Sequence, residues 1–79
     1  MKVFVKSVLG NHWELSHLDA RDTQVRHLKQ LLRFQTGIQL NTQQLLYKGA
    51  VLRDYSTLES CGISDGATVQ LVLQLGTGF

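Results

Sequence analysis

One helix-forming stretch stands in a chain whose other ordered segments all look like strands, and this limits the architectures open to it. The apolar residues of that stretch recur at spacings of three and four: Val25, Leu28 and Leu32. Polar residues occupy most other positions, as in an amphipathic helix of about three turns. Asp22 or Thr23 is expected to cap the first turn, and Gly37 stands where a left-handed glycine would end the helix. A lone amphipathic helix has to bury its apolar stripe against a sheet.

The remaining ordered segments alternate between apolar and polar side chains or form short runs that favour strands. They cover residues 1–8, 12–18, 45–47, 51–52 and 68–75. In the first of them Val3 and Val5 share one face and Phe4 points to the other. Short turns at 9–11 and 48–49 join neighbouring strands. The order of elements predicts an α+β fold in which a mixed five-stranded sheet packs on one helix.

The expected core gathers the inward-facing apolar residues of these segments. They are Val3, Val5, Trp13, Leu15, Val25, Leu28, Leu32, Ile38, Leu45, Leu52, Leu58, Ile63, Val69 and Leu71. A chain of 79 residues forms one domain, with little core to spare for a deep catalytic pocket. Trp13 has a second interpretation, as an exposed tryptophan that takes part in recognition.

Composition excludes several classes of protein. The net charge is +2 with basic and acidic residues interspersed, whereas nucleic-acid binding favours a clustered basic stripe. The single cysteine, Cys61, cannot form an internal disulfide, so we expect a reducing compartment, cytoplasmic or nuclear. No apolar run approaches the roughly 18 residues of a membrane span, and Lys6 interrupts the N-terminal segment where a signal peptide would be apolar. We expect a monomer that binds neither nucleic acid nor a membrane.

No constellation of catalytic, cofactor-binding or metal-ligating residues emerges. The sequence assigns Cys61 neither a base nor an orienting group, which favours a thiol that only packs. His12, His17 and His27 lack the spacing of a metal site. Gly76-Thr77-Gly78 follows a strand but opens no helix, unlike a phosphate-binding loop. The sequence therefore predicts no enzyme, no cofactor and no metal.

Three stretches closely resemble ubiquitin: "MKVFVK", "GIQLNTQQLLYKGAVLRDYSTLESCGI" and "TVQLVLQL". The most specific marks are the helix-ending "TGI", the pair Gln43-Gln44 before "LLYKG", and "LVLQL". The resemblance runs from Met1 to Leu75, with one small insertion near residues 18–24. The chain is thereby identified as a member of the ubiquitin-like superfamily, which implies the β-grasp fold. We expect the domain to cover residues 1–75, with 76–79 as a flexible tail or the start of a linker.

The resemblance also implies a binding surface. Ubiquitin meets most partners through a shallow apolar patch on its sheet, and the matching anchors here are Val8, Leu46 and Val72. The alternation agrees for two of them, because Leu46 and Val72 each follow an inward leucine and should face solvent. Exposed apolar residues gathered on a sheet mark a docking surface. The alternative is a scatter of single surface apolar residues, which is normal.

The predicted binding set adds Gln70, Lys48 and Lys6 at the rim of this patch. Several positions that match basic side chains and a histidine in ubiquitin are uncharged here: Gln44, Ala50, Gln70 and Gln74. Rim charge governs association rate and partner choice. We therefore expect a narrower or different set of protein partners, drawn from ubiquitin-binding domains, proteasome receptors or a regulatory partner.

The lysines make this chain poorly suited to being linked into ubiquitin-like chains. The two commonest linkage positions of ubiquitin correspond here to Ala50 and Asp65. Lys29 matches a largely buried helix lysine, and the matching acid is Asp54, so the resemblance implies a structural ion pair.

Two functions from different classes stay open. The first is a non-conjugated ubiquitin-like binding domain inside a longer protein. The second is a conjugatable, or degenerate, modifier processed near Gly78. Conjugation uses a C-terminal Gly-Gly whose lack of side chains lets it enter narrow enzyme channels. Here Thr77 separates Gly76 from Gly78, and Gln74 and Gly76 replace the preceding arginines, so the sequence favours the binding domain.

Overall fold

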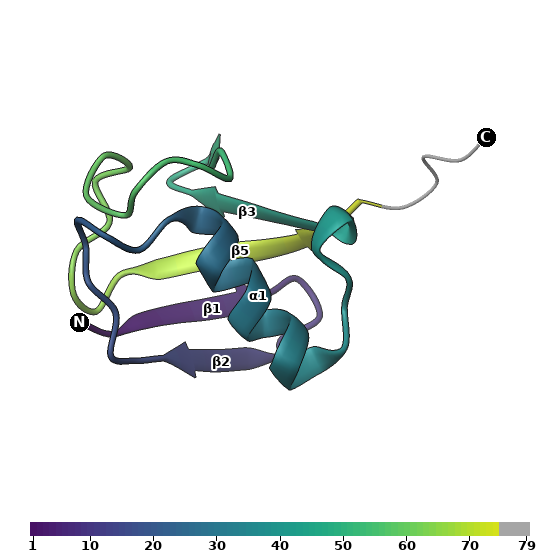
Figure 1. Cartoon of the computed structure of the whole chain (residues 1–79). Coiled ribbons are helices and arrows are strands. Elements are labelled where there is room, and N and C mark those ends of the chain that lie inside the picture. The colour runs from purple at the N-terminus through teal and green to yellow at the C-terminus, as the bar shows by residue number, and fades with distance from the viewer. Residues whose placement is uncertain (75–79) are drawn as a thin grey trace.

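Five strands form one mixed sheet, and a single α-helix crosses one of its faces in the part of the chain that the structure describes (Figure 1). The computed structural model describes residues 1–74. The elements are β1 (Val3–Ser7), β2 (His12–Leu15), α1 (Val25–Thr36), the short 3-10 helix η1 (Leu40–Thr42), β3 (Gln43–Tyr47), β4 (Ala50–Val51) and β5 (Thr68–Leu73). The predicted α+β architecture, with its mixed sheet on one helix, is confirmed.

The strands lie in the order β2-β1-β5-β3-β4. The pairing of β1 with β5 is parallel, and the other pairings are antiparallel. The register of the β1–β5 pair sets Val5 beside Val69 and Ser7 beside Leu71, so the first and last strands lie side by side. A parallel pair needs a long crossover connection. Here β2, α1, η1, β3 and β4 all belong to that connection (Figure 1).

Three strands are shorter than the alternation predicts, whereas β3 begins two residues earlier, at Gln43. β5 ends at Leu73, and Gln74 lies outside the strand. β2 ends at Leu15 rather than near residue 18, because His17 adopts a left-handed backbone with φ of 61° that breaks the extended run. β1 ends at Ser7, which leaves Val8 in the following turn. The predicted turn between β3 and β4 is present, with positive φ at Lys48 and Gly49 that suits a two-residue hairpin.

The helix begins at Val25, and neither Asp22 nor Thr23 caps it, so that prediction was wrong. The residue at the cap is Gln24, in an extended conformation. The Thr23 hydroxyl instead accepts a hydrogen bond from the Asp19 N–H, and the Asp19 carboxylate accepts one from Arg21, so residues 19–23 form their own turn.

Two donors of the first helical turn are satisfied by another loop. The N–H groups of Val25 and Arg26 donate to the carbonyls of Ser56 and Asp54, each at 2.9 Å. The Gln24 N–H donates to Nδ1 of His27 at 3.0 Å. Because distant backbone carbonyls share the capping with a local pairing of Gln24 and His27, Asp22 and Thr23 were misleading signals.

The end of the helix follows the prediction. Gly37 has φ of 78°, and its N–H donates to the Arg33 carbonyl at 2.8 Å. This left-handed conformation costs a glycine little because it has no Cβ. The helix stops at Thr36, and the chain then turns back toward the sheet.

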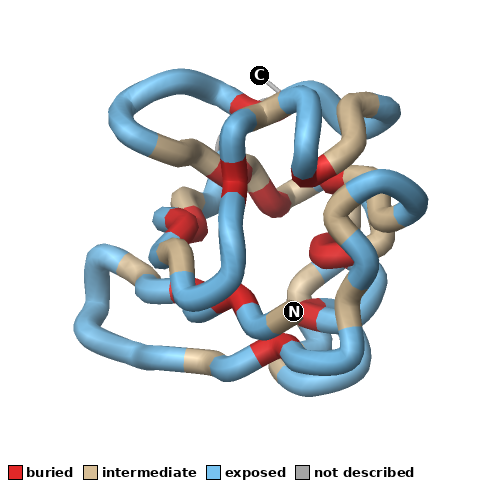
Figure 2. Tube along the Cα trace, turned by 90° about the vertical axis from the view of Figure 1, so that its left-hand side faces the viewer, coloured by how far each residue is buried: buried red, intermediate tan, exposed pale blue. Residues whose placement is uncertain are grey.

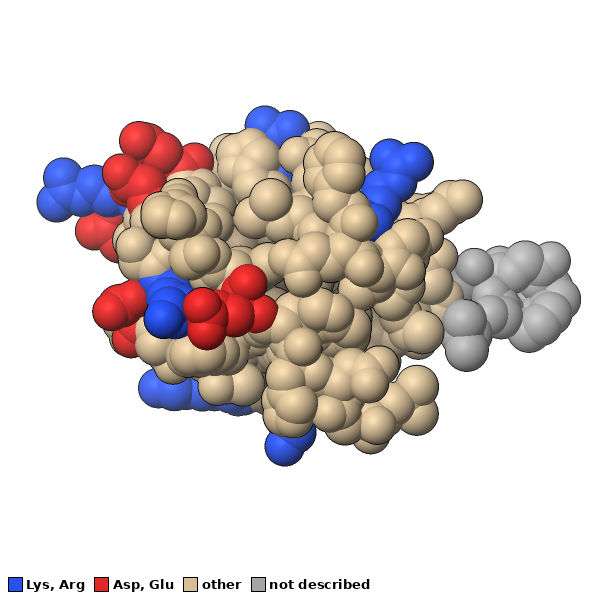
Figure 3. All heavy atoms as spheres, turned by 90° about the horizontal axis from the view of Figure 1, so that it is seen from below, with Lys and Arg blue, Asp and Glu red and all other residues tan. Residues whose placement is uncertain are grey.

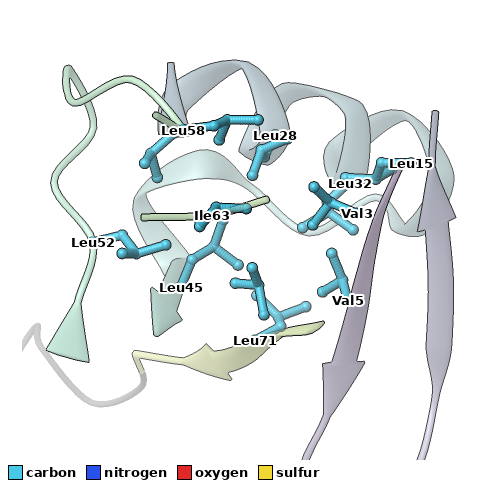
Figure 4. Packing of buried hydrophobic residues seen from close by; sticks show 12 residues of the cluster. Val3, Val5, Leu15, Leu28, Leu32, Leu45, Leu52, Leu58, Ile63 and Leu71 are labelled. Atoms are coloured by element: carbon cyan, nitrogen blue, oxygen red, sulfur yellow. The ribbon is translucent and has the colours of Figure 1, made fainter. Parts of the chain in front are cut away.

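Buried apolar side chains from the sheet, the helix and the loops fill the space between α1 and the sheet (Figure 4). Figure 2 marks the buried positions along the chain. They are Val3, Val5, Leu15, Val25, Leu28, Leu32, Leu45, Leu52, Leu58, Ile63, Val69 and Leu71. All were predicted. Two further predicted core residues, Trp13 and Ile38, pack against this cluster but stay partly exposed. Trp13 lies on β2, an edge strand, so nothing covers its outer side completely.

Two polar residues tie the helix to the rest of the domain. The buried Gln43 amide donates to the carbonyls of Lys29 and Ile38, each at 3.0 Å. The Lys29 ammonium lies 2.6 Å from the Asp54 carboxylate, and its side chain is only 11% exposed. The structure thus contains the ion pair that the resemblance implied. Asp54 is about half exposed, so water reaches one partner of the pair.

Removing the acid of this pair should destabilise the domain more than removing the base. Asp54→Asn leaves a largely buried ammonium without its counter-charge and should cost about 1–3 kcal/mol of unfolding free energy. Lys29→Met keeps the side-chain volume and leaves a carboxylate that water can solvate, so the loss should be smaller. Urea unfolding measures both. Arg21→Gln is the control, because it breaks an exposed pair with Glu59 and should change the stability by less than about 1 kcal/mol. Equal losses for all three variants would contradict a special role for this pair.

Candidate functional site

Leu46 and Val72, two of the three predicted anchors, lie on adjacent strands on the face of the sheet that α1 does not cover. In the β3–β5 register Leu46 pairs with Gln70, and Gln44 pairs with Val72. Directly paired residues share a face, and diagonal neighbours remain within reach of larger side chains. Of the residues that alternate with these four, Gln43, Leu45, Val69 and Leu71 are buried. Both anchors are partly exposed.

Val8 reaches the same region from the turn after β1 and is 75% exposed. Hydrogen bonds hold this turn: the Ser7 N–H donates to the Asn11 carbonyl at 2.9 Å, and the Ser7 hydroxyl accepts from the N–H groups of Leu9 and Asn11. Val8 and Val72 line one groove. The turn therefore presents Val8 next to the end of β5.

Two of the three predicted rim residues lie on the same open face. Lys6 and Gln70 are partners in the β1–β5 register, and both are exposed. Lys48 differs, because its ammonium lies 5.3 Å from the centre of the Tyr47 ring. Tyr47 packs against the core on the other side of β3 from Leu46. Lys48 is therefore engaged at the end of β3 and is not gathered with Lys6 and Gln70.

Sequence reasoning missed two apolar residues of this face. Val51 on β4 pairs directly with Leu46 and is 56% exposed, so it extends the apolar surface toward the sheet edge. Phe4 on β1 is 37% exposed. It lies two positions before Lys6 on the same strand, so both side chains point to the same face. The alternation already placed Phe4 outward, but only the strand register shows that Val51 stands opposite Leu46.

An apolar groove of about 560 Å³ adjoins the open face. It lies between the β1–β2 turn, the C-terminal end of α1 and the end of β5, and is lined by Ser7, Val8, Leu9, Asn11, Trp13, Gln35, Thr36, Ile38, Leu71, Val72 and Leu73. No charged side chain lines it. Seen from the β2 side, the acidic side chains in view gather at one end of the molecule, and the other end is mostly uncharged apart from a basic side chain at its edge (Figure 3). Trp13 packs against the core, as predicted, and also lines this groove; its role in recognition stays a prediction.

Cys61 and His27, which the sequence offered as candidates for chemistry, make contacts within the fold. Cys61 is partly buried against the core, and its N–H donates to the Thr57 carbonyl. His27 accepts the hydrogen bond at the start of α1. Within residues 1–74, no group of three or more histidine, cysteine or acidic side chains could hold a metal ion. None of the helices in this range has the length and apolar character needed to cross a bilayer.

Known proteins resemble this chain over most of its length. The chain is 38% identical over 70 residues to Ubiquitin-like protein NEDD8-like protein 2 of Dictyostelium discoideum, a match that covers 89% of this chain and 85% of that protein. It is 37% identical to Ubiquitin domain-containing protein DSK2 of Saccharomyces cerevisiae and 34% identical to DSK2a of Arabidopsis thaliana. These two matches cover 76% and 80% of this chain, but only 16% and 12% of the two DSK2 proteins.

The match to a whole family is broader than the match to any of these relatives. The sequence model described as the ubiquitin family matches residues 3–76. The five-stranded mixed sheet on one helix is the β-grasp arrangement expected of such a domain. The chain belongs to the ubiquitin family.

Proposed function

We propose that this ubiquitin-like domain is a non-conjugated protein-binding module that docks ubiquitin-receptor or proteasome-type partners through its open sheet face. The observation that carries the proposal is the gathering of Val8, Leu46 and Val72 at one exposed region, with Val51 extending it. The match to short stretches of the two longer DSK2 proteins supports a domain within a larger chain.

The geometry favours a partner that offers apolar side chains rather than charge. Lys6 is the charged member of the predicted set that lies on this face, whereas Gln44 and Gln70 flank the anchors. The adjoining groove has no charged lining residue. An amphipathic helix could cover the sheet face while one of its side chains enters the groove. We propose that the domain binds such a partner as a monomer, in the cytoplasm or nucleus. Nucleic acid, membranes and cofactors have no role in this binding.

The alternative function, a conjugatable modifier, has one observation in its favour. The match to the NEDD8-like protein spans 85% of that protein, as expected for a small modifier with no other domain. Against it stands the sequence of the tail, in which Thr77 separates Gly76 from Gly78. Residues 75–79, including this tail, lie outside the residues that the structure describes.

A ubiquitin-binding helix should perturb the open face of the sheet. In an isotope-detected titration, we expect shifts at Val8, Leu46 and Val72, and Leu46→Ser should weaken binding about tenfold by removing a central apolar contact. Phe34→Ser is the matched control, since it removes an exposed apolar residue from the helix. Circular dichroism checks that both variants fold. The absence of shifts at the three anchors would refute the docking proposal.

The single tryptophan of the chain reports on the groove. If a partner side chain enters it, Trp13 should become less accessible to acrylamide, and its emission should move to shorter wavelength. Leu46→Ser should abolish the change by preventing docking. An unchanged Trp13 signal at saturation would show that the partner uses the sheet face without the groove.

The unaltered chain should not be charged by a ubiquitin-type activating enzyme. Thr77 puts a branched side chain between the glycines at the end that the enzyme has to thread. We expect no thioester in a reaction in which ubiquitin is charged, both with the chain as it stands and after removal of Phe79. A thioester formed by either version would support the modifier and contradict the binding module.

A further inference from the structure

The helix carries an apolar surface on the side that faces away from the sheet. Leu32 is fully buried, and at about 100° per residue the side chain two positions later points almost directly outward. That residue is Phe34, which is 90% exposed. Leu31, three positions before it on the same outer side, is 37% exposed. An outward helix position usually holds a polar residue, so neither side chain is explained by folding.

Phe34 borders a shallow hollow. The hollow lies between α1 and η1 and is lined by Phe34, Leu40, Gln30 and Arg33, with a volume of about 550 Å³. Leu40 is partly buried and opens η1, which contacts the helix. Two apolar side chains with an amide and a guanidinium beside them could hold one apolar side chain and one acidic group of a ligand.

The segment that contains α1 and the hollow carries basic side chains and no acidic ones. Residues 23–53 contain no aspartate or glutamate. Of the cations on α1, Lys29 is paired with Asp54, and the Arg26 side chain donates to the Gln24 side-chain oxygen at 2.6 Å. Arg33 forms no salt bridge with any acid within residues 1–74. It is therefore the cation that remains available beside Phe34.

We propose that the outer face of α1 is a second docking surface, for an acidic segment of a partner protein. The segment places one apolar side chain in the hollow between Phe34 and Leu40, and a neighbouring carboxylate meets the Arg33 guanidinium. Arginine suits this role because its planar group can bind a carboxylate with two hydrogen bonds. An acidic partner also avoids repulsion anywhere along residues 23–53.

This surface is distinct from the one proposed for ubiquitin receptors. The helix covers one face of the sheet (Figure 1). Leu46 and Val72 alternate with buried residues of their strands and so lie on the other face. The two surfaces can thus be occupied together. The two proposals can also fail separately, because each predicts shifts at different residues.

The probe is an acetylated and amidated nine-residue peptide in which a central leucine is flanked on both sides by aspartates and glutamates. In an isotope-detected titration we expect saturable shifts for residues 30–34 and Leu40, with none at Leu46 or Val72. Phe34→Ala should weaken binding about tenfold, and Arg33→Gln about twofold to fivefold. Tyr55→Ala and Arg53→Gln are matched controls at other exposed positions and should leave binding unchanged.

Two altered peptides and one lipid probe complete the test. Exchanging the acids for their amides, or the leucine for serine, should remove the shifts, and added salt should weaken the binding of the parent peptide. Equal binding of the amide peptide, or shifts confined to the sheet face, would overturn the proposal. So would co-sedimentation with vesicles of phosphatidylserine and phosphatidylcholine that depends on Phe34 while the peptide fails to bind, since the surface would then serve a lipid.

Discussion

The parallel pairing of β1 with β5 is the constraint on which the rest of this domain depends. It joins residues near the two ends of the described chain, with Phe4 beside Thr68 and Ser7 beside Leu71. Every element between them has to pack within the crossover that closes this pair. The same pairing brings the β1–β2 turn to the end of β5, which creates both the groove and the approach of Val8 to Val72. Core and binding surface therefore share one origin.

Polar contacts then fix the helix within that crossover. The Gln43 amide reaches two carbonyls on and after α1, and Lys29 pairs with Asp54 from the loop whose carbonyls also receive the first N–H groups of the helix. Buried amides and ammonium groups are costly unless they are partnered. Since the groups that make these contacts with the helix come from β3 and from residues 54–56, they help to specify where the helix lies, in addition to its apolar stripe.

With the helix fixed on one face, the domain presents two unlike surfaces. The open sheet face and the groove are apolar with little charge. The outer face of α1 instead combines Phe34 with Arg33, which forms no salt bridge with any acid in residues 1–74. A module of this kind could bring two proteins together, one by apolar contact and one by charge and a single apolar anchor. The first surface holds the residues that the resemblance to ubiquitin implied, and the second was found from the exposure of Phe34 and from the charge of Arg33, unpaired within the described residues.

The sequence by itself determined the strands, the α-helix, the fold class and all of the buried core, because period-two and helical spacing are local properties of the chain; it did not show η1. It also showed that Leu46 and Val72 face outward, and the resemblance supplied Val8. It misplaced the helix cap, since the partners of Val25 and Arg26 come from residues 54–56, about 30 positions away. Only the tertiary structure could decide that Val51 stands opposite Leu46, that Lys48 turns to Tyr47, and that Trp13 is part of a groove. Register and chain packing set these neighbours, and neither is encoded in the spacing along one segment.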